Sequence, residues 1–238
     1  MTCVFTSVCA AFALTVVVRH ALRRRRRRRR PTIVAIDGPI AVGKSTLCRG
    51  LRRKGFVVEM EGADDPTRWQ RTLELFYTDL PRYCYLLQTG ILLDMVRQSD
   101  RLMHGPWPTA DGQCPRVVLI ERSPDSGLPF VRNSAAEGHL HPEEHRVYME
   151  LHRRMAWTPD YVVSLHVPVE EAIRRMHRRA RAAEQSVDAD YVRQIDGRYR
   201  SAMNDMPSPR VIVVDAGGDP DAVLERTIAA IKNVCEWL

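Results

Sequence analysis

The sequence predicts an α/β fold in which a five-stranded parallel sheet is flanked by helices. Five short segments are apolar and rich in β-branched residues, as buried parallel strands are. Long segments of helical character lie between them, and a glycine-rich loop joins the first strand to the first helix. Because strands that alternate with helices form a parallel sheet covered on both faces, we expect three layers.

The elements follow one another along residues 31–238, which we take as the globular domain. The strand segments read TIVAI (32–36), FVVEM (56–60), RVVLI (116–120), YVVSLHV (161–167) and RVIVV (210–214). Residues 102–115 hold three prolines and two glycines, which favours a loop. We expect helices at 46–54, 68–100 with a break near Pro81, 142–157, 169–183, 188–203 and 219–238.

Residues 1–30 differ in composition from the rest and are expected to lie outside the fold. Residues 1–18 carry no charge, and nine arginines, Arg19 and the run 23–30, follow them. Three interpretations stay open: a short anchor helix that contacts a membrane, a mitochondrial presequence, or a dispensable extension. We favour the extension. The six cysteines form no C-x-x-C pair and suit a reducing compartment, so we expect the domain in the cytoplasm.

The arginine tract accounts for the basic character of the chain. The net charge is +7, but outside those nine arginines 27 basic and 29 acidic residues remain, a balance of −2. The charge of the globular part therefore does not predict binding to nucleic acid.

Residues 38–45 match the phosphate-binding loop (P-loop) pattern G-x-x-x-x-G-K-S between a strand and a helix. Glycines at both ends let the backbone curl so that its N–H groups face phosphate oxygens. The lysine supplies a cation for the outer phosphates, and the serine hydroxyl suits Mg²⁺. The predicted ATP-binding residues of this loop are Gly38, Pro39, Ile40, Ala41, Val42, Gly43, Lys44, Ser45 and Thr46.

Two later stretches supply further charged groups. Glu121 ends the third strand, where a carboxylate can reach the Mg²⁺ shell, and Arg122 follows it. Arg175, Arg179 and Arg181 follow the fourth strand, where an arginine-rich lid would neutralise charge on the transferring phosphoryl group. The alternatives are a surface salt bridge for Arg122 and a solvated basic helix face for the other three.

Several motifs in order resemble the deoxynucleoside kinase family, which includes deoxycytidine kinase and the herpesvirus-type thymidine kinases. Glu121-Arg122-Ser123 resembles the family's (D/E)RS motif, and 179–184 resembles its R-x-R-x-x-E lid. Segments 76–83 and 87–89 resemble its substrate-side helix pair, and the resemblance covers about 32–205. It implies a P-loop kinase-type fold, ATP and Mg²⁺ as cofactors, and a homodimer.

The resemblance also implies roles for single residues. Gln88 would bind the base edge, Tyr77 and Glu184 the sugar 3′-hydroxyl, and Ser45 and Glu121 would serve Mg²⁺. Trp69 and Phe130 would form walls for the base. The residues expected to take part in catalysis are Lys44, Glu61, Arg122, Arg179 and Arg181.

The general base is where the chain departs from the family pattern. The family has Glu-Pro after the second strand with a tryptophan about five residues on, whereas this chain has Glu61-Gly62 and then Trp69. Glu59 lies two residues earlier on the same face of the strand, and Asp64 and Asp65 are further alternatives. We choose Glu61 for its distance from the P-loop lysine along the chain.

The base preference has one indication. Relatives that favour cytidine and purine substrates keep an Arg and an Asp in the pocket, and Met95 and Gly127 stand at the matching positions. We therefore expect thymidine, with deoxycytidine, as the substrate whose 5′-hydroxyl is phosphorylated for nucleotide salvage.

Two other functions remain as alternatives. A thymidylate kinase also has a P-loop and a lid, but typically carries Asp-Arg-Tyr where this chain has residues 121–123. A non-catalytic nucleotide-binding protein tethered by residues 1–30 is the alternative of another class.

Overall fold

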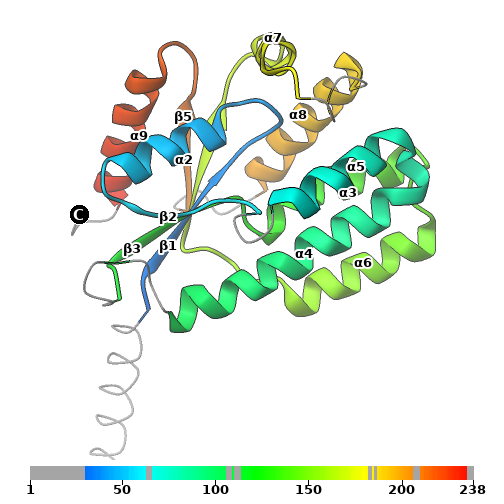
Figure 1. Cartoon of the computed structure of the whole chain (residues 1–238), viewed down its shortest axis with the longest axis horizontal. Coiled ribbons are helices and arrows are strands. Elements are labelled where there is room, and N and C mark those ends of the chain that lie inside the picture. The colour runs from blue at the N-terminus through cyan, green and yellow to red at the C-terminus, as the bar shows by residue number, and fades with distance from the viewer. Residues whose placement is uncertain are drawn as a thin grey trace, which may run out of the picture.

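The computed structural model describes residues 30–62, 66–105, 109, 114–181, 184, 187–205 and 210–234, with the backbone alone at 66–70. Its centre is a five-stranded sheet in the order β2-β3-β1-β4-β5, with every pairing parallel (Figure 1). The predicted α/β class is confirmed. The strands are β1 (Thr32–Asp37), β2 (Val57–Glu59), β3 (Val117–Glu121), β4 (Tyr161–His166) and β5 (Val211–Asp215).

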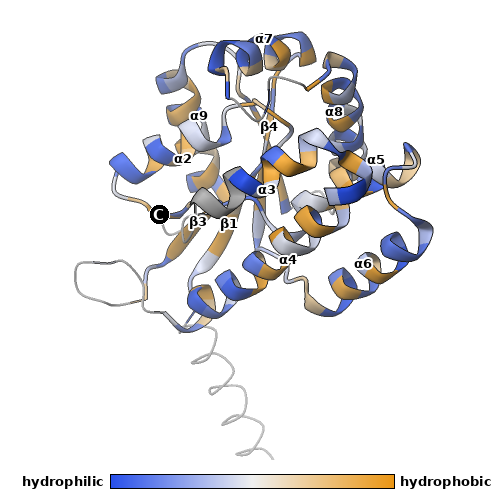
Figure 2. Ribbon diagram, turned by 45° about the vertical axis from the view of Figure 1, so that its right-hand side comes forward, coloured by the Kyte–Doolittle hydropathy of each residue, from blue (hydrophilic) through white to orange (hydrophobic). Residues whose placement is uncertain are grey.

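Helices cover both faces of the sheet, so β1 is buried on both sides. Val34 and Ile36 face α2 (Lys44–Arg53) and α9 (Pro220–Val234), in a core that includes Leu51. Ile33 and Ala35 point the other way and join the core that contains Leu102 of α4 (Leu80–His104) and Met203 of α8 (Ala189–Asn204). These are the three layers expected, and apolar residues gather between them (Figure 2).

A helical cluster beside the sheet carries the substrate side of the molecule. It consists of α3 (Pro66–Thr78), α4, α5 (Leu128–Ala136) and α6 (Pro142–Met155), packed around Phe76, Leu92 and Tyr148. The predicted break near Pro81 is present, since Asp79 caps α4 by accepting a hydrogen bond from Arg82 N at 3.1 Å.

The sequence reading differs from the structure in three places, one of which is that α4 continues to His104, into the loop predicted over 102–115. It assigned no element to η1 (Pro124–Gly127) and α5, where two prolines and a glycine interrupt the helical pattern. It also extended the lid helix to 183, whereas α7 (Val169–Arg179) ends where Ala180 adopts a left-handed conformation with φ 48°.

The membrane and presequence hypotheses for residues 1–18 lie outside the described residues. Within the described part of the chain no helix has the length and apolar character needed to cross a bilayer. Arg30, the last arginine of the tract, contacts the fold, because its guanidinium donates to both carboxylate oxygens of Asp160 at 2.8 and 2.7 Å.

Candidate active site

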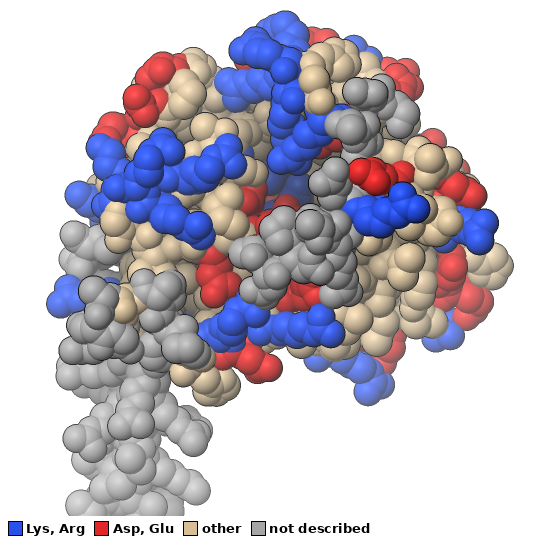
Figure 3. All heavy atoms as spheres, viewed as in Figure 1, with Lys and Arg blue, Asp and Glu red and all other residues tan. Residues whose placement is uncertain are grey.

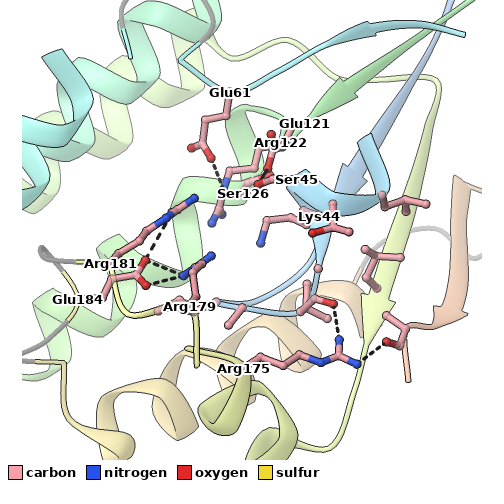
Figure 4. Close-up of a pocket in the computed structure, with 18 of the residues that line it drawn as sticks. Lys44, Ser45, Glu61, Glu121, Arg122, Ser126, Arg175, Arg179, Arg181 and Glu184 are labelled. Carbon is pink, nitrogen blue, oxygen red and sulfur yellow. Dashed lines mark hydrogen bonds and ion pairs between the residues drawn. The ribbon is translucent and has the colours of Figure 1, made fainter. Parts of the chain in front are cut away.

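A cavity of about 1020 Å³ opens at the carboxyl ends of the strands (Figure 4). The P-loop closes one end of it, and α3 and α4 form the other. Gly38 and Pro39 belong to the loop but not to the cavity lining, and the side chain of Trp69 lies outside the described residues. The other predicted residues line it: 40–46, Glu61, Tyr77, Gln88, Met95, Glu121, Arg122, Gly127, Phe130, Arg175, Arg179, Arg181 and Glu184.

The P-loop has a backbone conformation that depends on its two glycines. Gly38 has φ 142°, and a Cβ there would lie 2.7 Å from the carbonyl oxygen of Leu165. Gly43 has φ 112° and precedes the first turn of α2. The loop therefore presents the start of α2, with its unpaired N–H groups, to the cavity, as a phosphate site requires.

Lys44 lies beneath the loop and is folded back onto it. Its Nζ donates to the carbonyl oxygens of Gly38 at 2.8 Å and Pro39 at 2.6 Å. Burial, together with the charge of Arg122, lowers the pKa of Lys44 to about 7, although Asp37, Glu121 and Glu61 oppose the shift. An anion placed in the loop would stabilise the charged form of this lysine.

Ser45 and Glu121 bring oxygen ligands together beside the loop. Ser45 Oγ donates to Glu121 Oε1 at 2.5 Å, and Glu121 is buried at the end of β3. Among the described residues no group of three or more His, Cys, Asp or Glu side chains is placed to hold a metal ion. One hydroxyl and one carboxylate fit Mg²⁺, which takes few protein oxygens and completes its shell with nucleotide phosphates and water.

Glu61 faces the cavity as an ion pair with Arg122. Arg122 Nε donates to Glu61 Oε2 at 2.9 Å, and the guanidinium lies 5.3 Å from the ring centre of Phe130. Burial works against the charged guanidinium, but Glu61 and the nearby Tyr199, Asp37 and Glu121 raise the pKa of Arg122 above its ordinary value.

Glu59 occupies a different environment from Glu61. Its carboxylate lies 3.5 Å from Arg101 of α4, and it is absent from the described residues that line the cavity. Asp64 and Asp65 lie outside the described residues. The geometry therefore favours Glu61 over Glu59 as the carboxylate that meets a substrate.

The lid arginines fall into two groups. Arg179 and Arg181 pair with the buried carboxylate of Glu184, at 2.6 and 3.6 Å. Arg175 instead donates to the carbonyl oxygens of Val42 at 3.2 Å and Ala216 at 3.0 Å, so it stabilises the backbone of the P-loop. Figure 3 shows basic side chains gathered over α7 and α2.

Polar atoms at the far end of the cavity are buried and unpaired. Gln88 is 3% exposed, and its Oε1 has no hydrogen-bond partner among the described residues. It lies close to Gly127, where a Cβ would be 3.6 Å from Oε1. Because a buried carbonyl oxygen rarely stays unpaired, Gln88 is ready to receive a donor from a ligand.

Some residues at the cavity carry no motif and were missed from the sequence. Tyr191 lines it with a buried hydroxyl that has no hydrogen-bond partner among the described residues, and Arg49 lies at its phosphate end. Ser126 lines it and donates to Asp37, while Tyr199 contacts Arg122. Only Asp37, which directly precedes the P-loop, had a signal in its position.

A family model described as "Deoxynucleoside kinase" matches residues 34–236. The chain belongs to the deoxynucleoside kinase family. It is thus an ATP-dependent phosphotransferase, as the P-loop and lid predicted, and the family assignment favours this activity over the thymidylate kinase and non-catalytic alternatives.

Relatives within the family differ in their named substrates. A putative deoxynucleoside kinase of Frog virus 3 is 27% identical over 196 residues, covering 78% of this chain and 92% of the viral protein. The thymidine kinase of Ictalurid herpesvirus 1 is 27% identical over 207 residues, covering 82% of this chain and 84% of its own. A Dictyostelium discoideum deoxyguanosine kinase is 26% identical over 200 residues, covering 81% of this chain and 67% of its own.

Solved structures agree on the fold. The structure of a deoxyadenosine kinase from M. mycoides superposes with a TM-score of 0.70 at 20% identity, covering 85% of this chain and 99% of the other.

Proposed function

We propose that this deoxynucleoside kinase transfers the γ-phosphoryl group of ATP to the 5′-hydroxyl of thymidine, and that it also accepts deoxycytidine. The observation that carries the proposal is the placement of Gln88. Its buried, unpaired amide oxygen lies in the same cavity as Lys44, Glu61 and Arg122. One end of the cavity thus suits a base edge and the other suits phosphates.

The chemistry follows from the side chains along this cavity. The 5′-oxygen attacks the γ-phosphorus, the bond between that phosphorus and the bridging oxygen of ADP breaks, and Glu61 takes the hydroxyl proton. Lys44 and the lid arginines Arg179 and Arg181 stabilise the charge on the transferring group. Ser45 and Glu121 would hold Mg²⁺, which neutralises charge on the β- and γ-phosphates when it is bound.

The preference for a pyrimidine rests on the neutral character of the base end. The amide of Gln88 offers one acceptor and one donor, which can pair with the neighbouring donor and acceptor of thymine or, after an amide flip, of cytosine. Apolar side chains surround it, including Leu87, Ile91 and Met95, and Gly127 adds no charge. Such a wall suits the methyl group of thymine.

We also propose that the protein is a homodimer that uses α4. Leu86 and Leu93 are 55% and 40% exposed. They lie seven positions apart, so they share one face of this helix. Light scattering after gel filtration tests this, and a monomer at micromolar concentration would contradict it.

A nucleoside panel with ATP and Mg²⁺ tests the substrate. We expect turnover of thymidine, then deoxycytidine, with purine deoxynucleosides slower, and no phosphorylation of thymidine monophosphate. Gln88→Leu should lower kcat/KM for thymidine by about 100-fold. The reason is that removing the side chain that hydrogen-bonds the base leaves polar atoms of the bound substrate without partners. Gln98→Leu, on the same helix but outside the described cavity lining, is the control. Faster turnover of deoxyguanosine than of thymidine at equal concentration would contradict the proposal.

A further inference from the structure

Tyr199 is a buried residue of α8 that contacts the proposed catalytic arginine. It is 1% exposed, and its hydroxyl accepts a hydrogen bond from Arg122 Nη1 at 2.6 Å. The hydroxyl donates its own proton to the carbonyl oxygen of Ser126 at 2.7 Å. Burial raises the pKa of the phenol well above its ordinary value, so the proton for this second bond is retained.

Arg122 also has an unusual backbone conformation. It has φ 69°, a left-handed conformation that residues other than glycine seldom adopt. Its side chain is held from two sides, by Glu61 at Nε and by Tyr199 at Nη1. The ring of Phe130 lies against the guanidinium and also packs edge-on against Tyr199, with ring centres 5.9 Å apart. α8 therefore contributes, through Tyr199, one of the contacts that hold the Arg122 side chain.

The same tyrosine is connected to the P-loop. Ser126, whose carbonyl accepts the Tyr199 proton, donates through its own hydroxyl to Asp37 Oδ2 at 2.5 Å. Asp37 Oδ1 in turn accepts from the backbone N–H of Gly38 at 2.7 Å. One hydroxyl on α8 thus joins the Glu61–Arg122 pair to the first glycine of the phosphate loop.

We propose that Tyr199 is a positioning residue that acts through Arg122, holding this arginine and its partner Glu61 in the orientation required for phosphoryl transfer. The proposal rests on the proposed function in the role that it gives to Glu61 and Arg122. Tyr199 itself does not line the cavity, so its effect reaches the substrate only through the residues that it holds.

Steady-state kinetics of Tyr199→Phe test the proposal with the best deoxynucleoside of the panel. The substitution removes one oxygen and keeps the ring that packs on Phe130. We expect kcat to fall by roughly 10- to 100-fold, the range for a lost hydrogen bond to a charged group, while KM changes by less than about twofold. Tyr161→Phe is the matched control. Tyr161 begins β4, at the end of the strand away from the cavity, so this variant should keep the kcat of the wild type.

A double-mutant cycle separates positioning from a merely structural role. In an Arg122→Lys background, which lacks the guanidinium fork, Tyr199→Phe should cost less than about twofold, because its target is already lost. The same 10- to 100-fold loss in both backgrounds, or the kcat of the wild type in Tyr199→Phe, would overturn the proposal. A variant with 3,5-difluorotyrosine at position 199 keeps the hydroxyl as a weaker acceptor, and an intermediate loss is expected even if the phenylalanine variant does not fold.

The nucleoside panel and the double-mutant cycle separate a failure of the proposed function from a failure of the proposed role of Tyr199. If thymidine is not the best substrate, or if Glu61→Gln keeps its activity, the proposed function fails in that respect. The cycle still reports whether Tyr199 and Arg122 are coupled, because it uses whichever deoxynucleoside the enzyme accepts.

Discussion

Arg179 Nη2 donates to both carboxylate oxygens of Glu184, at 2.7 and 2.6 Å. Glu184 is only 8% exposed, whereas about a third of the Arg179 side chain is exposed. A carboxylate proposed to bind the sugar 3′-hydroxyl therefore also holds a lid arginine. If the proposal holds, the nucleoside and the lid share this side chain, and a substitution of Glu184 tests it.

Replacing Glu184 by Gln should weaken both contacts. We expect KM for thymidine to rise about tenfold, because a hydrogen bond to a charged acceptor becomes one to a neutral amide. The preference for thymidine over 3′-deoxythymidine, measured as a ratio of kcat/KM, should shrink by a similar factor. Glu150→Gln is the control, since Glu150 also pairs with two arginines but lies on the surface of α6. An unchanged ratio in Glu184→Gln would exclude a contact with the 3′-hydroxyl.

The choice between Glu61 and Glu59 predicts unequal effects of the same substitution. Glu61→Gln should lower kcat by about 10²- to 10⁴-fold, the usual loss on removing a general base. Glu59→Gln should change kcat by less than about threefold, because Glu59 pairs with Arg101 away from the described cavity lining. Rapid-quench measurement of the first turnover isolates the chemical step. A large loss in Glu59→Gln alone would reverse the assignment.

The elements of the sheet could be predicted from the sequence because their signals are local. Each of the five apolar runs and the glycine-rich loop can be recognised from fewer than ten consecutive residues, and all of them appear where expected. The position of Glu121 at the end of β3 follows from the strand itself. By contrast η1 and α5 have no clear local pattern, and tertiary packing against α4 and α8 stabilises them.

The parts of the site that depend on long-range contacts could not be predicted. Arg175 lies in a run of arginines, and nothing in that run shows that its guanidinium meets the carbonyl oxygens of Val42 and Ala216. Tyr199 follows the lid by many residues and has no motif, yet it contacts Arg122 across the fold. Sequence patterns indicate which side chains are available, whereas packing decides which of them meet.

The P-loop should not tolerate a side chain at Gly38. In Gly38→Ala the new methyl group would lie 2.7 Å from the carbonyl oxygen of Leu165, at a φ of 142° that L-residues rarely adopt. We expect ATP affinity to fall by at least tenfold and the unfolding midpoint to drop by several degrees. Isothermal calorimetry and thermal unfolding measure the two effects.

Gly138→Ala is the matched control for Gly38→Ala. Gly138 also has a positive φ, 72°, but a Cβ there would meet nothing within 4 Å. It should cost about 1 kcal/mol from backbone strain and leave ATP affinity unchanged. If the unfolding midpoint fell equally in the two variants, backbone strain alone, and not the contact with Leu165, would limit position 38.

Binding of ATP should be accompanied by proton uptake at Lys44. The pKa of this lysine is lowered to about 7 when no phosphate is bound, so at pH 8 most molecules carry it neutral. The negative charge of the phosphates stabilises the ammonium form and raises the pKa, so the lysine gains a proton as ATP binds. At pH 6 the free protein already holds that proton, and uptake by Lys44 disappears. Calorimetric titrations with ATP in buffers of different ionisation enthalpy give the number of protons taken up at each pH.

Lys44→Arg serves as the control for this linkage, because a guanidinium stays protonated across the whole range. We expect close to one proton taken up at pH 8 by the wild type and none by the variant. The sign follows from the direction of the pKa shift of Lys44. Because this pKa is lowered in the free protein, binding of an anion leads to proton uptake, whereas a raised pKa would leave the protonation of Lys44 unchanged near pH 8. Equal uptake in the two proteins would place the titrating group elsewhere in the cavity, and no uptake in the wild type would mean that Lys44 is already charged before the nucleotide arrives.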